Sequence, residues 1–257
     1  MSDEPLVDVR REGVACVVTL RRERKLNALS TALEGALGDA LEHADVRGSA
    51  CVIFTGGPRA FSAGADVGEL RGLDPAAILA YYRATGDVYE RIARFPQPTI
   101  AAIAGHCLGG GLELALATDF RVADTTASFG LPEVGIGILP SSGGTLRLVR
   151  MVGTARAKEL ILLGERFGAE AAHRHGVLTQ VVAEGESVPR ALALAERIAA
   201  LPPVAVVVAK QVIDAMPDAS YDAGLALERL AYGMLAQTDD AREAAAAFAD
   251  KRRPGAT

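Results

Sequence analysis

Two glutamates in this sequence stand among residues that carry few other charges. Glu113 follows three consecutive glycines in the segment GGGLELALA, which begins at Gly109. Glu133 is the one charged residue of SFGLPEVGIGILPSSGG, residues 128–144. A carboxyl group among apolar neighbours tends to have a raised pKa, which suits a group that donates or accepts protons near neutral pH. The pair is therefore a candidate for acid–base chemistry.

Each of these features also has a purely structural interpretation. Glu133 alone fits a solvent-facing loop residue. Glu113 alone fits the first turn of a helix, where the helix dipole favours a negative side chain. The glycines at 109–111 alone fit close packing of a helix on a strand. Only their combination indicates a site that could hold a carbonyl oxygen and move protons beside it.

Two turns of small residues offer backbone N–H groups to such a ligand. One lies at 63–65 in AFSAGADVGEL, and the other is the glycine triplet. Glycine permits a positive φ and a close approach to the main chain, and the free N–H groups of a first helical turn bind anions. If both turns follow neighbouring parallel strands, their amides meet at the strands' carboxyl ends, where open α/β folds bind ligands.

Several common chemical signatures are missing from the sequence. The turn at 105–111 reads GHCLGGG, which is not G-x-G-x-x-G, and neither a P-loop Gly-Lys-Ser/Thr nor a G-x-S-x-G serine motif occurs. The four histidines show no metal pattern, since His173 and His175 are two apart and point to different faces of a helix. We therefore predict neither a metal nor a nucleotide cofactor.

Strands alternate with helices to about residue 185, which indicates an α/β fold with mostly parallel pairing. The expected strands are 14–20, 50–55, 99–104 and 120–123, and the expected helices are 28–41 and 75–95. The strand at 99–104 is expected to pass through the glycine turn directly into a helix, and 128–144 is expected to be loop-rich. Beyond 186 only helices are expected, at 188–200, 204–215, 222–237 and 239–251. We therefore divide the chain into an α/β core, 1–190, and a helical assembly region, 191–257.

Composition narrows the class of protein further. The 257 residues carry a net charge of −5 with 50% hydrophobic content, which argues against nucleic-acid binding. The basic run RRERK at 21–25 fits either a solvated loop or a site for ligand phosphates. No apolar run reaches the roughly 20 residues of a membrane span, and the acidic N-terminus has no apolar core, so we expect a cytoplasmic protein. Cys16, Cys51 and Cys107 show no paired spacing and are expected to be reduced.

Taken in order, these motifs resemble those of the enoyl-CoA hydratase/isomerase, or crotonase, superfamily over nearly the whole chain. The matching segments are NAL at 27–29, FSAGAD at 61–66, GGGLELALATDFRVA at 109–123, FGLPEVGIGILPSSGGT at 129–145 and AAFADKRRP at 246–254. The resemblance implies a spiral of ββα units with a helical C-terminal region that builds homotrimers, commonly paired as homohexamers. It also implies a coenzyme A thioester as substrate, with coenzyme A as part of that substrate and no separate cofactor.

The resemblance also assigns site residues. It places Glu113 and Glu133 as the catalytic pair and the N–H groups of Ala65 and Gly110 as the oxyanion hole, so the expected anion is a thioester oxygen becoming an enolate. Residues implied to contact the acyl-CoA are Lys25, Leu26, Ala28, Ala63, Gly64, Asp66, Gly109, Ser141, Phe248 and Lys251, the last two from a neighbouring subunit. The chain departs from the family at Ala104, where asparagine is usual, and at Ser141, where glycine is common. His106, which follows the first departure, is expected to be structural.

The expected reaction is the syn addition of water to a trans-2-enoyl-CoA, giving a 3-hydroxyacyl-CoA. Glu113 would activate the water and Glu133 would exchange the proton at the α-carbon. Relatives that only isomerise double bonds often lack the first glutamate, so its presence favours hydration. Two alternatives stay open: a Δ3-Δ2 enoyl-CoA isomerase that uses Glu133 alone, and an acyl-CoA-binding protein without turnover.

Overall fold

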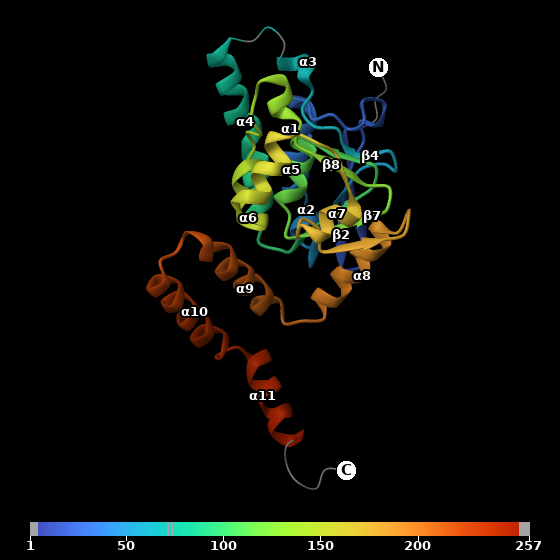
Figure 1. Cartoon of the computed structure of the whole chain (residues 1–257). Coiled ribbons are helices and arrows are strands. Elements are labelled where there is room, and N and C mark those ends of the chain that lie inside the picture. The colour runs from blue at the N-terminus through green and yellow to red at the C-terminus, as the bar shows by residue number, and fades with distance from the viewer. Residues whose placement is uncertain (1–4, 71, 73, 252–257) are drawn as a thin grey trace. The chain divides into compact units, whose positions relative to one another are not determined.

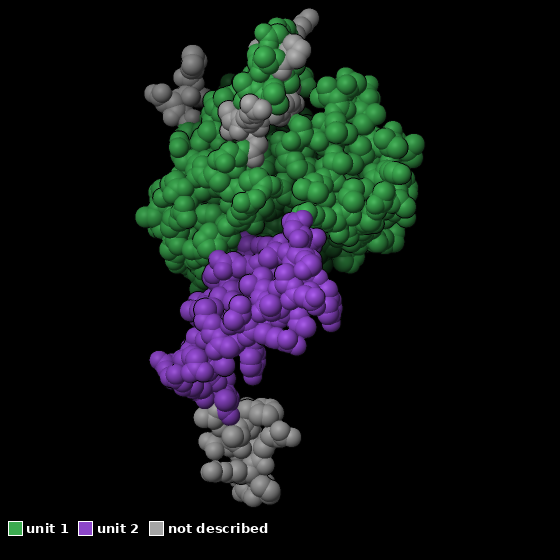
Figure 2. All heavy atoms as spheres, turned by 90° about the vertical axis from the view of Figure 1, so that its left-hand side faces the viewer, with its two compact units in different colours: residues 1–198 green, residues 199–257 purple. Residues whose placement is uncertain are grey.

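The computed structural model describes residues 5–70, 72 and 74–251 (Figure 1). Its internal contacts divide the chain into two compact units, Met1–Ile198 and Ala199–Thr257, which Figure 2 colours separately. The first unit holds every strand of the described chain, and the second is helical. The predicted α/β fold with a helical C-terminal region is confirmed.

The larger of the two sheets in the first unit has six strands. Its strands run in the order β1 (Val7–Glu12), β2 (Ala15–Leu20), β3 (Cys51–Thr55), β5 (Thr99–Ile103), β7 (Phe120–Asp124) and β10 (Gln180–Val182). Only the β1–β2 pair is antiparallel, so the prediction of mostly parallel pairing holds. Every residue of β3 and β5 is buried, as expected for parallel strands covered on both faces.

A smaller second sheet was not expected. It contains β4 (Ala60–Ser62), β6 (His106–Leu108), β8 (Ser128–Gly130) and β9 (Phe167–Gly168), with β4, β6 and β8 parallel. The expected direct passage from the strand at 99–104 into a helix is therefore wrong, because β6 intervenes. The stretch after 128, expected to be loop-rich, likewise begins with β8. Segments of two or three residues are too short to show a period, and tertiary contacts decide their pairing.

Helices of the first unit cover the sheets. They are α1 (Thr31–Ala40), α2 (Ala44–Arg47), α3 (Val67–Leu70), α4 (Pro75–Ala93), α5 (Gly110–Leu116), α6 (Gly144–Leu162), α7 (Ala169–Arg174) and α8 (Ser187–Ala199), with 3-10 turns η1 (Glu23–Lys25) and η2 (Glu133–Ile136). Helix α1 packs on α4, and α5 on α6 (Figure 1). Ser30 starts α1 by accepting a 3.3 Å bond from the Leu33 N–H. Leu33, Leu37 and Leu41 are buried, so the predicted apolar face of this helix is confirmed.

The second unit consists of α9 (Pro203–Ala215), η3 (Met216–Asp218), α10 (Tyr221–Leu235) and α11 (Asp239–Lys251). Helices α9 and α10 pack against each other. These bounds agree with the predicted helices to within a few residues. Over the described residues, no single helix is long and apolar enough to cross a membrane, and one bent pair, α8 with α9–η3, meets that test by length and composition only.

Gly111 of α5 lies directly against Ser62 of β4. A Cβ atom at this position would lie 2.5 Å from the Ser62 carbonyl oxygen and 2.8 Å from the Ser62 Cβ. We therefore expect Gly111→Ala to lower the free energy of unfolding by about 1–3 kcal/mol in urea titrations, because backbone must move to admit the methyl group.

Gly35→Ala is the matched control for this substitution. Gly35 is exposed on α1, and a Cβ there would meet nothing within 4 Å. Alanine should stabilise that helix by about 0.5–1 kcal/mol. Equal effects of the two substitutions would contradict the close contact between α5 and β4.

Candidate active site

One cavity of about 110 Å³ in the first unit brings the predicted chemistry together. It is lined by both small-residue turns, both glutamates and two serines of the later loop: Ala63, Gly64, Ala65, Gly109, Gly110, Glu113, Glu133, Ser141 and Ser142. Apolar and aromatic side chains form much of the remaining wall: Val67, Tyr81, Tyr89, Pro132, Ile136, Ile138 and Leu139. The lining can hold an apolar chain beside a pair of acids.

The two small-residue turns touch because they follow paired strands. Strands β4 and β6 run parallel and end just before residues 63 and 109, so the predicted meeting of the turns occurs, on the smaller sheet rather than the larger one. Gly64 and Gly109 adopt φ values of +97° and +51°, which favour glycine. A Cβ on Gly64 would lie 3.3 Å from the Gly110 nitrogen, and one on Gly110 would lie 3.5 Å from the Ala65 nitrogen.

The N–H groups of Ala65 and Gly110 are available to a ligand. Within the described part of the chain, neither of them donates a hydrogen bond to another protein group. Their neighbours are engaged, since Asp66 N–H donates to the Leu29 carbonyl at 2.8 Å and Gly109 N–H to the Gly130 carbonyl at 2.9 Å. Two adjacent donors beside a cavity can bind an oxygen that gains negative charge.

Glu113 is held rigidly inside the fold. Its side chain is 3% exposed, and its Oε1 accepts hydrogen bonds from the backbone N–H groups of Ser142 and Gly144, both at 2.8 Å. Burial raises the pKa of Glu113, and these two backbone hydrogen bonds oppose the rise. The glutamate is therefore a fixed acid at the cavity wall, and not a residue that merely serves the helix dipole.

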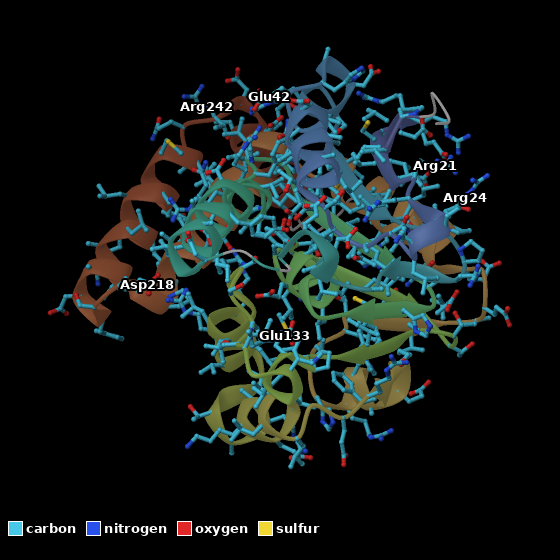
Figure 3. All side chains as sticks on the ribbon, turned by 90° about the horizontal axis from the view of Figure 1, so that it is seen from above. Arg21, Arg24, Glu42, Glu133, Asp218 and Arg242 are labelled. Carbon is cyan, nitrogen blue, oxygen red and sulfur yellow. The ribbon has the colours of Figure 1, made fainter. Side chains whose placement is uncertain are left out.

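Glu133, labelled in Figure 3, begins the short turn η2, and its side chain lies close to the glycine turn. A Cβ on Gly109 would lie 2.8 Å from its Oε1. Its Oε2 is buried and has no hydrogen-bond partner among the described residues. Burial, with a contribution from the charge of Glu113, raises the pKa of Glu133 to about 7. This is the raised pKa that the apolar sequence context predicted.

The predicted contacts of the first loop lie outside the cavity lining. Lys25 is the exposed last residue of η1, and Leu26 and Ala28 follow it in the chain. The Leu26 carbonyl accepts a 2.9 Å hydrogen bond from the Ala63 N–H, which joins this loop to the first small-residue turn. Buried Asn27 joins the same loop to β4, because its Nδ2 donates a 3.0 Å hydrogen bond to the Ala60 carbonyl.

Asp66 also lies outside the lining, with its carboxylate engaged elsewhere. Its Oδ2 lies 2.7 Å from Nη2 of Arg22, and its Oδ1 accepts a 3.1 Å hydrogen bond from the Gly68 N–H. The hydrogen bond from Arg22 lowers the pKa of Asp66. The side chains of Phe248 and Lys251 lie outside the described residues.

Sequence reasoning missed a third acid in the cavity, Glu34 on α1. It is 6% exposed and lines the cavity, and its Oε1 accepts a 2.8 Å hydrogen bond from the hydroxyl of Tyr89 on α4. Burial raises its pKa to about 7, against the opposing effect of the Tyr89 hydrogen bond. The sequence did contain an indication of this burial, because Glu34 lies three residues before Leu37, on the same apolar face of the helix.

Replacing Glu34 with glutamine should change how stability depends on pH. The folded pKa of about 7 lies above the ordinary glutamate pKa of 4.5, so the folded protein retains this proton more readily than the unfolded chain does. The stability due to this group is complete below about pH 4.5 and is lost as the pH rises through 7. The free energy of unfolding of Glu34→Gln, measured in urea titrations, should therefore rise relative to that of the wild type by about 2–3 kcal/mol as the pH increases from 5 to 8.

The control for this pH series is Glu170→Gln, at an exposed position of α7 outside the cavity lining. Its free energy of unfolding should change with pH in the same way as that of the wild type. The same pH dependence for Glu34→Gln would contradict the raised pKa of Glu34.

Metal and disulfide chemistry find no support in the described residues. No cluster of three or more His, Cys, Asp or Glu side chains there could hold a metal ion. All three cysteines are buried and form no disulfide, although Cys16 and Cys51 lie on the paired strands β2 and β3.

The fold and the site together define an α/β protein in which three acids and two backbone donors meet at one partly apolar cavity. The family model for enoyl-CoA hydratase/isomerase matches residues 10–256. A 2,3-dehydroadipyl-CoA hydratase of Escherichia coli is 41% identical, with 96% of each chain covered, and a probable enoyl-CoA hydratase of Rhizobium meliloti is 39% identical, with 98% of each covered. The crystal structure of an enoyl-CoA hydratase from Bacillus anthracis superposes with a TM-score of 0.89 at 39% identity, covering 96% of this chain and 97% of that one.

The chain therefore belongs to the enoyl-CoA hydratase/isomerase family. The predicted family and its crotonase fold are confirmed.

Proposed function

We propose that this protein adds water across the double bond of trans-2-enoyl-CoA thioesters to give 3-hydroxyacyl-CoA. The observation that carries the proposal is that Glu113 and Glu133 line one cavity beside the unpaired N–H groups of Ala65 and Gly110. The names of the relatives support the same activity. Coenzyme A enters as part of the substrate, and the reaction needs no further cofactor.

In the proposed mechanism the thioester oxygen accepts hydrogen bonds from the Ala65 and Gly110 N–H groups. A donor aimed at the developing enolate oxygen typically contributes about 3–4 kcal/mol in the transition state. The two turns are rigid because each follows a strand of the smaller sheet. Their fixed positions avoid reorganisation during the reaction, which is the basis of their contribution.

The two glutamates divide the transfer of protons. Ionised Glu113 takes a proton from the water as the water oxygen bonds to the β-carbon, and the electrons of the double bond move to the thioester oxygen. Protonated Glu133 then gives its proton to the α-carbon, and the electrons return to restore the carbonyl. Glu113 afterwards releases its proton to solvent and Glu133 takes one up, which restores the starting state. The pKa of about 7 keeps Glu133 partly protonated near neutral pH, as this role requires.

We also propose that the chain acts as a homotrimer or homohexamer. Several large apolar side chains are exposed on α9 and α10 of the second unit: Val204, Ile213, Leu227, Leu230, Tyr232 and Met234. Exposed apolar surface of this extent is typical of protein interfaces. In such an assembly, Phe248 and Lys251 would reach the coenzyme A of a neighbouring subunit.

Product analysis tests the reaction. The purified protein should convert crotonyl-CoA to 3-hydroxybutanoyl-CoA. If a 3-enoyl-CoA is isomerised rapidly while crotonyl-CoA stays unchanged, the protein is an isomerase and the proposal fails. Tight binding of acyl-CoA with turnover of neither substrate would instead indicate a protein that only binds.

A further inference from the structure

Glu34 has no part in the proposed hydration, yet it is a buried carboxyl in the wall of the same cavity. Its Oε1 is bound to the Tyr89 hydroxyl, but its Oε2 is buried and has no partner among the described residues. Tyr89 also lies close to the oxyanion turn, since its hydroxyl would be 3.5 Å from a Cβ on Gly110. Glu34 and Tyr89 therefore line the same cavity as the oxyanion turn, and Glu34 also lines a second hollow beside Thr31 and Arg91.

No described neighbour supplies the partner that Oε2 lacks. The charged groups that act on Glu34 are Glu69 and Glu113, and both carry the same sign. The guanidinium of Arg91 is engaged by the Gly38 carbonyl at 3.0 Å and by Glu42 at 2.7 Å. A buried carboxyl oxygen that lacks a partner is costly unless a ligand completes its hydrogen bonding.

A hydroxyl group is the ligand chemistry that fits this oxygen. With a pKa of about 7, Glu34 is present near neutral pH both as a carboxylate and as an acid. A hydroxyl can donate to the carboxylate and accept from the acid, whereas an alkyl chain can do neither. A second carboxylate would be repelled by ionised Glu34 and by Glu113.

We propose that the cavity selects a trans-2-enoyl-CoA that carries a hydroxyl group beyond the double bond, and that Oε2 of Glu34 binds this hydroxyl. This inference rests on the proposed function and names the class of its substrate. Glu34 is thus a specificity-determining residue, held in place by Tyr89.

The kinetic test compares kcat/KM for trans-2-hexenoyl-CoA with that for its 4-, 5- and 6-hydroxy derivatives. The wild type should prefer one hydroxylated isomer over the unsubstituted chain by about tenfold or more, since a hydrogen bond to a charged group contributes about 1.5–3 kcal/mol. Glu34→Leu should abolish this preference. A wild type without the preference, or a leucine variant that keeps it, would overturn the proposal.

Glu69→Gln is the matched control, because it removes the neighbouring charge without a change in the cavity lining. It should keep the preference for the hydroxylated chain.

A second variant covers the case in which Glu34→Leu does not fold. Glu34→Gln keeps the shape of the side chain and removes its repulsion of a substrate carboxylate. It should raise kcat/KM for a 2-hexenoyl-CoA with a terminal carboxylate several-fold over the wild type, and no rise would count against the proposal.

A binding measurement separates this inference from the proposed function. Hexanoyl-CoA and its hydroxylated forms cannot be hydrated, so their Kd values by calorimetry report recognition alone. A preference of about tenfold for one hydroxylated chain in the wild type, lost in Glu34→Leu, would uphold the selectivity even if no enoyl-CoA were hydrated. Hydration of crotonyl-CoA without any such preference would uphold the reaction and refute the selectivity.

Discussion

Glu113→Gln and Glu133→Gln are each expected to lower kcat for the hydration of crotonyl-CoA by about 10²–10⁴-fold, the usual contribution of a positioned acid or base. Glutamine keeps the size of each side chain and can still accept the hydrogen bonds that Ser142 and Gly144 donate to position 113. Both variants should therefore fold, with a Tm at or above that of the wild type, because glutamine also removes a carboxyl whose pKa burial raises. The measurement is kcat at saturating substrate, together with a thermal melt.

Glu170→Gln is the control for these two variants, because Glu170 is an exposed carboxylate outside the cavity lining. Its kcat should equal that of the wild type. A hydration rate near normal in either cavity variant would remove that glutamate from the mechanism. Isomerisation of a 3-enoyl-CoA that survives Glu113→Gln and is lost in Glu133→Gln would show that Glu133 acts alone in that reaction.

The second large effect is expected from Gly109→Ala. Gly109 adopts φ +51° and ψ −128°, a conformation that side chains rarely allow, and a Cβ there would lie 2.8 Å from Oε1 of Glu133. The methyl group would strain the oxyanion turn and displace the catalytic carboxyl at the same time. We expect kcat to fall by at least about 100-fold, because a displacement of the order of 1 Å has that effect on positioned groups.

Gly135→Ala provides the comparison within the same region. Gly135 lies two residues beyond Glu133 on η2, and a Cβ at this position would meet nothing within 4 Å. This variant should retain most of the wild-type kcat. If Gly109→Ala retains as much activity as Gly135→Ala, the oxyanion turn is not where the structure and the proposed mechanism require it.

The elements of the large sheet could be predicted because their sequences show their environment directly. Strands β3 and β5 are continuous apolar runs, and α1 repeats leucine every four residues. Strands β4 and β6 have three residues each and pair only because other parts of the fold hold them together. The sequence therefore predicted that the two turns meet, but it assigned them to the strands of the wrong sheet.

Some residues of the site could likewise be predicted from the sequence, and others could not. Glu113 and Glu133 were predictable because each is a lone charge in an apolar or glycine-rich segment, and the resemblance to a family gave them roles. Glu34 was not, because a single charge within a helix usually lies at the surface, and its burial depends on Tyr89, which is 55 residues away in the sequence. Asp66 was expected at the ligand, but its pairing with Arg22 became visible only in three dimensions.

A crystal structure with butanoyl-CoA, a saturated thioester that cannot be hydrated, tests the central claim most directly. The thioester oxygen should lie about 2.7–3.1 Å from the nitrogens of both Ala65 and Gly110, with the α- and β-carbons between Glu113 and Glu133. An oxygen that contacts neither nitrogen, or an acyl chain that lies outside this cavity, would contradict it.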